Sequence, residues 1–187
     1  GVGTTEQFYN LSKGLFSGID WTQVTSLVVT AVRGNVPAAG ALNVRLGDHP
    51  WTTQVPSDPL LTAADISHLS GIFQWVGFDS DVAPATGVTN SFAQASATQG
   101  SLTYSGLDVD GEFAGAISSF DDYGTVPVES EDLSAVTSFV LGLSFTAGTG
   151  DLEFTVEDAL GGSSKVLLTG VGTTEQFYNL SKGLFSG

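Results

Sequence analysis

The first eighteen residues of this chain occur again, unchanged, at its end. Residues 1–18 and residues 170–187 both read GVGTTEQFYNLSKGLFSG. Because diverged duplications accumulate differences, full identity indicates recent copying, a tandem array or a deliberately engineered overlap. The two copies start 169 residues apart, which is the size of a domain and far above the ~20–50 residues of a solenoid repeat. The sequence therefore predicts that residues 1–169 form one repeat unit and that residues 170–187 begin the next.

Alternating and β-branched residues predict many short strands between the two copies. Residues 24–32 (VTSLVVTAV) are apolar on both faces, as expected of a central strand in a covered sheet. Leu42, Val44 and Leu46 alternate with other residues, which is typical of a strand with one buried face. The remaining predicted strands cover residues 74–78, 101–104, 111–117, 125–128, 139–145, 152–156 and 165–169, with Gly-rich turns at 147–150 and 158–164.

Three segments are less clearly patterned. Residues 4–18 fit either a short helix with one apolar face or an extended segment with a turn at Lys13–Gly14. Residues 62–71 open with a capping box and predict a helix. Residues 82–100 fit a long surface loop or weak strands. Together the patterns predict a mainly β fold, an antiparallel β-sandwich or jelly roll with one or two short helices.

The composition excludes several classes of partner. Twenty acidic residues against five basic ones give a net charge of −15, so nucleic acid and anionic lipid surfaces would be repelled. No apolar run approaches the ~18–20 residues of a membrane span, and we expect no membrane insertion. The chain has no cysteine, which excludes disulfides and thiolate metal sites. An acidic surface suits salty or calcium-rich surroundings, where cations screen the repulsion.

Residues 132–169 followed by residues 1–48 form one continuous pattern when they are read across the join. Its fixed points are Asp158, Gly161, Gly162, Phe16, Gly18, Asp20, Trp21, Thr22, Val24, Ser26 and Leu27. The pattern resembles the jelly-roll β-sandwiches of secreted bacterial surface proteins that are sorted by a Pro-Glu-Pro C-terminal signal. That signal does not occur in these 187 residues. The resemblance implies an extracellular or cell-surface location and no particular reaction.

The duplicated segment lies in the middle of this pattern and not at a boundary. We therefore expect residues 170–187 to complete the sandwich begun by residues 132–169, while residues 1–18 belong with the strands at 24–46. The segment would join successive copies of the chain head to tail, either covalently or as a strand donated between chains. Contacts of this kind do not close on themselves and build filaments. The predicted junction residues are Phe8, Tyr9, Leu11, Leu15, Phe16, Phe177, Tyr178, Leu180, Leu184 and Phe185.

Acidic clusters are candidate calcium sites, and calcium is the one cofactor that we consider. Asp108, Asp110 and Glu112 alternate, so on a strand all three would point to one face. Such a set suits a calcium ion or, on a jelly roll, the carboxylates of a glycosidase. Asp79 and Asp81, after the strand at 74–78, form a second candidate site. A solvated acidic turn is the alternative for both groups.

Aromatic residues offer a different kind of site. Trp51, Tyr104 and Tyr123 are candidate contacts for a surface glycan. The two histidines, His49 and His68, lack a metal-binding spacing, and no nucleophile motif or phosphate loop is present. We therefore expect no enzyme but a structural unit of an extracellular tandem-repeat protein or filament. A carbohydrate-binding or adhesive β-sandwich module is the alternative.

Overall fold

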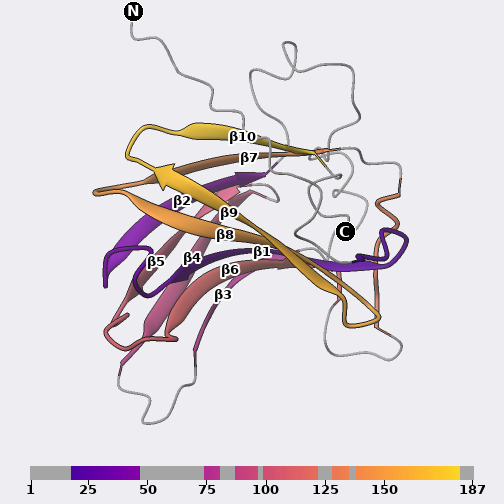
Figure 1. Ribbon diagram of the computed structural model, residues 1–187, viewed down its shortest axis with the longest axis horizontal. Helices are drawn as coiled ribbons and strands as arrows, with labels where there is room; N and C mark the ends of the chain where they lie inside the picture. The colour runs from indigo at the N-terminus through magenta and orange to yellow at the C-terminus, as the bar shows by residue number, and fades with distance from the viewer. Residues whose placement is uncertain are drawn as a thin grey trace, which may run out of the picture.

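The computed structural model describes residues 18–46, 74–80, 87–96, 99–121, 128–134 and 138–181 (Figure 1). These residues form two antiparallel sheets packed face to face as a β-sandwich, and they contain no helix. The ten strands in this part of the chain are β1 (Val24–Val32), β2 (Gly40–Leu46), β3 (Gln74–Asp79), β4 (Thr89–Ser96), β5 (Gln99–Ser105), β6 (Phe113–Ser119), β7 (Ser138–Phe145), β8 (Gly150–Asp158), β9 (Ser163–Val171) and β10 (Gln176–Ser181).

Sheet 1 has the strand order β3-β6-β1-β8-β9, and sheet 2 has the order β10-β7-β2-β5-β4. Several strands that are consecutive in the chain, such as β7 and β8 or β9 and β10, lie in different sheets, so the chain repeatedly crosses the sandwich. At one edge β3 lies beside β4, where Asn90 Nδ2 donates a hydrogen bond to Asp79 Oδ2 (2.8 Å). The strands β9 and β10 form the other edge.

The strand β1 lies in the centre of sheet 1, as its apolar sequence predicts. It pairs with β6 on one side and β8 on the other, so that Val28 lies opposite both Ile117 and Thr155. Leu27 and Val29 point between the sheets and are fully buried. Val28 points to the outer face of sheet 1 and is still only 6% exposed. Its neighbours in the sheet therefore shield Val28, although the outer face of sheet 1 is open to solvent.

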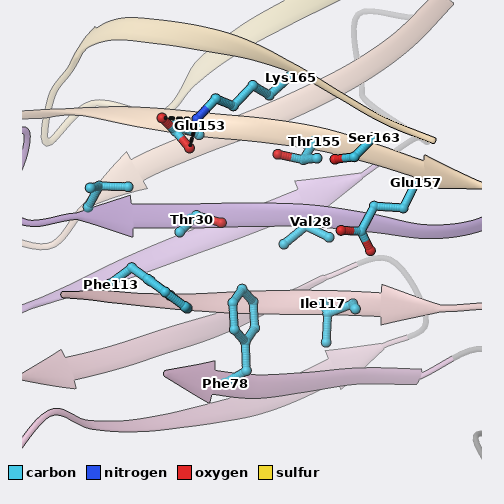
Figure 2. Close-up of a pocket in the computed structure, with 11 residues that line it drawn as sticks. Val28, Thr30, Phe78, Phe113, Ile117, Glu153, Thr155, Glu157, Ser163 and Lys165 are labelled. Atoms are coloured by element: carbon cyan, nitrogen blue, oxygen red, sulfur yellow. Dashed lines mark hydrogen bonds and ion pairs between the residues drawn. The ribbon is translucent and has the colours of Figure 1, made fainter. Parts of the chain in front are cut away.

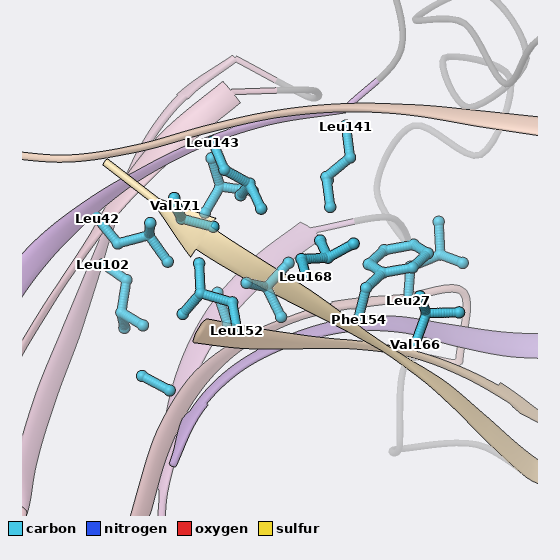
Figure 3. Packing of buried hydrophobic residues seen from close by; sticks show 14 of the residues in the cluster. Leu27, Leu42, Leu102, Leu141, Leu143, Leu152, Phe154, Val166, Leu168 and Val171 are labelled. Atoms are coloured by element: carbon cyan, nitrogen blue, oxygen red, sulfur yellow. The ribbon is translucent and has the colours of Figure 1, made fainter. Parts of the chain in front are cut away.

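The core lies between the two sheets (Figure 3). Leu152, Phe154 and Leu168 of sheet 1 pack towards Leu42 and Leu143 of sheet 2, and all are at most 1% exposed. Burying one such side chain stabilises a fold by ~1.5–3 kcal/mol relative to leaving it exposed. Because alternate residues supply the core, a slip of one residue in strand register would turn a whole strand's apolar set towards solvent.

The mainly β fold and most of the predicted strands are confirmed. Residues 89–96 form β4, so the strand alternative for residues 82–100 is right where the structure describes them. The predicted start of a strand at residue 111 is wrong, because β6 begins at Phe113. The cause is a turn with Gly106 at φ +81° and Gly111 at φ +93°, a conformation that glycine adopts most easily.

Other predictions fall on residues that the structure does not describe. The predicted helix at 62–71 lies outside the described residues, and so does the segment at 4–18 except for Gly18. Of the predicted strand at 125–128, only Val128 is described, and it is not in a strand.

The two ends of the sandwich contain different parts of the chain. Residues 146–149 join β7 to β8, so the start of β7 lies at the same end as the end of β8. Val24 pairs with Asp158, which places the start of β1 at this end too. We call it the Asp158 pole. The opposite pole contains the connections at 33–39, 106–112, 146–149 and 172–175.

Candidate inter-unit junction

The second copy of the duplicated segment takes part in both sheets. Its first two residues, Gly170 and Val171, end β9 in sheet 1, and Val171 is fully buried. Residues 172–175 cross to sheet 2, where the next six residues form β10. In this copy, therefore, the extended alternative describes residues 176–181, and the helical one does not.

The strand β10 pairs with β7 along its whole length. The antiparallel register runs from Gln176 opposite Leu143 to Ser181 opposite Ser138. Tyr178 lies within this register and is 1% exposed, so it anchors β10 in the core. Because β10 is the outermost strand of sheet 2, β7 is the single described strand that it pairs with. We call the place beside β7 that β10 fills the acceptor position.

Two contacts fix the connection that leads into the acceptor position. The backbone N–H of Phe145 donates a hydrogen bond to the carbonyl of Gly172 (2.8 Å). The Nε of Arg45, on β2, lies 3.1 Å from Oε1 of Glu175. Both side chains of this ion pair are about one-third exposed, so we expect it to stabilise the fold by ~0.2–1 kcal/mol. The ion pair therefore contributes little to the stability of β10 in the acceptor position.

One carboxylate at the Asp158 pole fixes the chain where it leads into β1. Asp158 is 6% exposed. Its Oδ1 accepts hydrogen bonds from the backbone N–H groups of Leu160 (2.9 Å) and Gly162 (2.7 Å), which closes the β8–β9 turn. Its Oδ2 accepts a hydrogen bond from the backbone N–H of Asp20 (2.7 Å), 138 residues away in the chain. The same side chain thus ties this turn to the start of β1.

The glycines of the Asp158-x-x-Gly161-Gly162 motif are explained by this turn. Gly161 has φ +83°, where a residue with a side chain would be strained. A Cβ on Gly162 would overlap the buried carboxylate of Asp158. This part of the pattern that carried the resemblance therefore holds one carboxylate against two backbone segments.

Asp20 continues the same network towards β1. Its Oδ1 accepts hydrogen bonds from the hydroxyl (2.7 Å) and the backbone N–H (3.0 Å) of Thr22, and its Oδ2 accepts one from Gln23 Nε2 (3.2 Å). These hydrogen bonds, that of the Thr22 hydroxyl first, lower the pKa of the Asp20 carboxyl below its ordinary value. Ile19, next to it, is 8% exposed and packs in the core. The residues that follow the first copy are firmly positioned.

The chain enters and leaves the sandwich at the same pole. Ser181 pairs with Ser138 at the start of β7, which lies at the Asp158 pole. Ile19 and Asp20 lie at that pole as well, because Asp20 is bonded to Asp158. In Figure 1, the last residues of β10 and the first residues of the indigo segment lie on the same side of the molecule.

The structure describes three of the ten predicted junction residues. Phe177, Tyr178 and Leu180 lie in β10, and the buried Tyr178 is the one whose side-chain environment is described. The others, Phe8, Tyr9, Leu11, Leu15, Phe16, Leu184 and Phe185, lie outside the described residues.

The strand interpretation of the acidic residues 108–112 is wrong. These residues form a turn, so their alternation does not place them on one face. Asp108 and Asp110 are exposed, whereas Glu112 is 4% exposed. The Oε2 of Glu112 accepts hydrogen bonds from the backbone N–H groups of Asp108 (2.6 Å) and Val109 (2.7 Å). Glu112 therefore closes an acidic turn, which is the alternative that the sequence left open.

The second acidic pair is described only in part. Asp79 ends β3 and accepts the hydrogen bond from Asn90, whereas Asp81 lies outside the described residues. Within the described ranges, no three acidic or histidine side chains are grouped so that they could hold a metal ion. Calcium binding stays a prediction.

Of the predicted glycan contacts, only Tyr104 is described. It is 2% exposed and belongs to the core, and its hydroxyl lies against Gly40. Burial raises the pKa of Tyr104 to about 12. The prediction for Tyr104 is wrong, because its place in the β5 alternation turns it inward. Trp51 and Tyr123 lie outside the described residues.

An open groove of about 820 Å³ lies on the outer face of sheet 1 (Figure 2). Phe78 and Phe113 lie side by side at one side of it, with ring centroids 5.8 Å apart and ring planes tilted by 55°. On the other side Lys165 Nζ lies 2.9 Å from Glu153 Oε1. The remaining lining residues are Val28, Thr30, Val32, Ile117, Thr155, Glu157 and Ser163.

This groove could not be predicted from the sequence, because its residues come from five strands that are far apart in the chain. One signal was present. Residues 24–32 are apolar on both faces, and their outward residues Val28 and Val32 line the groove. Apolar residues on the second face of a strand indicate a buried or recessed surface there. They do not show which residues of the neighbouring strands line that surface.

No protein-family model, no curated protein and no solved structure matches this chain. Among the described residues, no helix has both the length and the apolar character needed to cross a membrane.

Proposed function

We propose that this chain is a structural unit of an extracellular tandem-repeat protein, joined head to tail through the duplicated segment. The observation that carries the proposal is β10. Residues that would open the next unit fill the acceptor position beside β7 and place Tyr178 in the core of the preceding unit. A segment with both roles is a shared strand, and a chain of units that share strands is an array or filament.

The surface chemistry supports an extracellular setting. The net charge of −15 favours the solubility of such units, and an acidic surface suits salty or calcium-rich surroundings, where cations screen the repulsion. The Asp-x-x-Gly-Gly turn and the Asp20 segment, which carried the resemblance to secreted surface proteins, form one bonded network at the Asp158 pole. On these grounds we place the proposed array outside the cell or on its surface.

The test is a three-unit chain in which residues 1–169 occur twice and are followed by residues 1–187. We expect the β-sheet circular dichroism signal per residue to equal that of the single unit. Unfolding should occur at the same temperature or higher, and negative-stain micrographs should show evenly spaced beads. As a matched control, Asp replaces Tyr9 and its internal equivalents, which removes the anchor of each shared strand. If the unmodified three-unit chain loses its sheet signal or aggregates, units cannot share strands and the proposal fails.

The groove on sheet 1 favours a second candidate function, carbohydrate binding. The open groove has two aromatic rings on one side and carboxylates and hydroxyls on the other. It can therefore contact both the apolar face and the hydroxyl groups of a sugar. Glu157 is positioned by Ser26, whose hydroxyl donates it a hydrogen bond of 2.5 Å. Tyr104, the described residue among the predicted glycan contacts, does not line this groove.

A glycan array tests the second candidate. We expect binding to be lost with Phe113→Ala and to weaken with Glu157→Gln. Leu167→Ala, on the exposed outer face of β9, is the matched control and should leave binding unchanged. If the unmodified chain binds no glycan, this function is excluded, and the structural proposal is unaffected.

A further inference from the structure

Each folded unit has one acceptor position, but the sequence that fills it occurs twice in residues 1–187. Gln176–Ser181 occupies the position in the structure, and residues 7–12 have the identical sequence QFYNLS. The residues that make the contacts of the second copy have identical counterparts in the sequence of the first. Glu6 corresponds to Glu175, the partner of Arg45, and Tyr9 corresponds to the buried Tyr178.

The first copy is tethered closely enough to reach the acceptor position of its own chain. A strand formed by residues 7–12 would end beside Ser138, at the pole where Ile19 is packed in the core. Seven residue steps lead from Ser12 to Ile19, and they span up to about 25 Å. The path runs to the other sheet and two strands inward, about 14 Å for sheets ~10 Å apart and strands ~4.8 Å apart.

We propose that the two copies are interchangeable occupants of the acceptor position beside β7. The chain then folds as either of two sandwiches that are circular permutants of each other. With the second copy in place, the strand follows β9. With the first copy in place, it precedes β1, and Val171 remains in the core because it belongs to β9.

The number of strand copies per acceptor position also indicates how units are linked. This inference rests on the proposed function. In a chain of residues 1–187, one position and two copies leave one copy in surplus and no empty position for a neighbouring chain to fill. A tethered strand competes at an effective concentration in the millimolar range for a short flexible linker. Strands of other chains at micromolar concentration are therefore excluded. Units are linked covalently, through residues equivalent to 13–18, and not by strand exchange between separate chains.

Disulfide trapping in the full chain tests the proposal, because the chain contains no cysteine of its own. Ser138→Cys with Ser181→Cys reports the second copy, since the two residues are opposite each other in register. Ser138→Cys with Ser12→Cys reports the first copy in the same way. Opposed residues have Cα atoms about 4.5–5.5 Å apart, within the range of a disulfide. Ser138→Cys with Ser105→Cys, at the opposite pole, is the control for random contact.

We expect both strand pairs to form a disulfide within a single chain, as seen by non-reducing electrophoresis and by mass, and the control pair to stay reduced. If the Ser12 pair is oxidised no faster than the control pair, the second copy alone fits the position and the proposal is overturned. If the Ser12 pair joins two chains into dimers or ladders, strands are exchanged between molecules and the covalent linkage is overturned.

A second variant separates occupancy from folding. Added to the Ser12 pair, Tyr178→Asp places a charge in the competing copy and should raise the yield of the intrachain disulfide at least twofold. Tyr9→Asp should abolish it, while Thr173→Asp, an exposed residue of the second copy, should leave it unchanged. If the Ser12 pair fails but the three-unit chain folds, interchangeability is lost and the proposed function stands. If the three-unit chain fails, the proposed function is lost whatever the disulfides show.

Discussion

The two poles of the sandwich use the same chemical device over very different distances in the chain. At the opposite pole, buried Glu112 accepts two backbone N–H groups from residues three and four positions earlier. At the Asp158 pole, buried Asp158 accepts two from its own turn and a third from Asp20, 138 residues away. One carboxylate shapes a local turn, and the other joins two distant parts of the chain.

A buried carboxylate affects the stability of the whole fold when it joins segments that are remote in the chain. A local turn that loses its carboxylate can open towards water and hydrate its free N–H groups. At the Asp158 pole, an opened turn also releases the segment that leads into β1, the central strand of sheet 1. We therefore expect the poles to respond unequally to equivalent substitutions.

The largest effect should come from Asp158→Ala. Three backbone N–H groups lose a charged acceptor in a mostly buried site, and we expect the free energy of unfolding to fall by about 3–5 kcal/mol. Urea unfolding followed by circular dichroism measures it. Asp158→Asn, which keeps one oxygen acceptor, should lose less. Equal losses for Asp158→Ala and Glu112→Ala would contradict the contrast between the poles.

Gly162→Ala should rank second. The added methyl group overlaps the carboxylate of Asp158, which is held by three hydrogen bonds and cannot move aside without breaking them. We expect a loss of about 1–3 kcal/mol in the same urea measurement. Gly172→Ala is the matched control, since its methyl group would meet only Thr149 at 4.0 Å, and it should cost nothing. A neutral Gly162→Ala would show that the network tolerates displacement.

Glu112→Ala should have a smaller effect at the opposite pole. The two N–H groups that it leaves free belong to exposed residues, and water can reach them. We expect a loss of about 1–2 kcal/mol, with faster amide hydrogen exchange confined to residues 106–112. Asp110→Ala, in the same turn and exposed, controls for the change in charge. Faster exchange that spreads into β1 would mean that this pole is also coupled to the whole sandwich.

The smallest effect concerns acid. Because hydrogen bonds lower the pKa of Asp20 in the folded state, its contribution to stability is present above the unfolded pKa of about 3.9 and is lost as the pH falls through the folded value. Asp20→Asn should therefore be less stable than the unmodified chain at pH 7, and the two should converge below about pH 4. Urea midpoints at several pH values measure the difference, and a constant difference down to pH 2.5 would refute it.

Much of the sandwich could be predicted from local sequence. The strands β1 and β7–β9 have clear apolar patterns, and their boundaries are close to those predicted. The segment at 89–96 stayed ambiguous, because its small polar residues favour no single structure. The acidic residues at 108–112 were left between a strand and a turn, because alternation of charge looks like a strand pattern, whereas Gly106 and Gly111 indicate a turn.

For the candidate sites too, local sequence features could be predicted and contacts between remote residues could not. The identity of the two copies and the pattern that runs across the join predicted that residues 170–187 would complete the sandwich, and β10 lies where that prediction puts it. Contacts between remote residues could not be predicted. The pairing of Arg45 with Glu175, the bond from Asp20 to Asp158 and the groove on sheet 1 each depend on which strands become neighbours.

The shared location of Ile19 and Ser181 at one pole sets the outline of any assembled protein. A covalent array built from this unit should resemble a comb, with a narrow spine of Asp158 poles and sandwiches that project sideways like teeth. Each added unit lengthens the spine by the width of one pole and a six-residue linker, equivalent to residues 182–187, rather than by the length of a sandwich. The acidic turns at 106–112 would then lie at the free ends of the sandwiches and face the surrounding medium. Repulsion between these turns would keep neighbouring sandwiches apart.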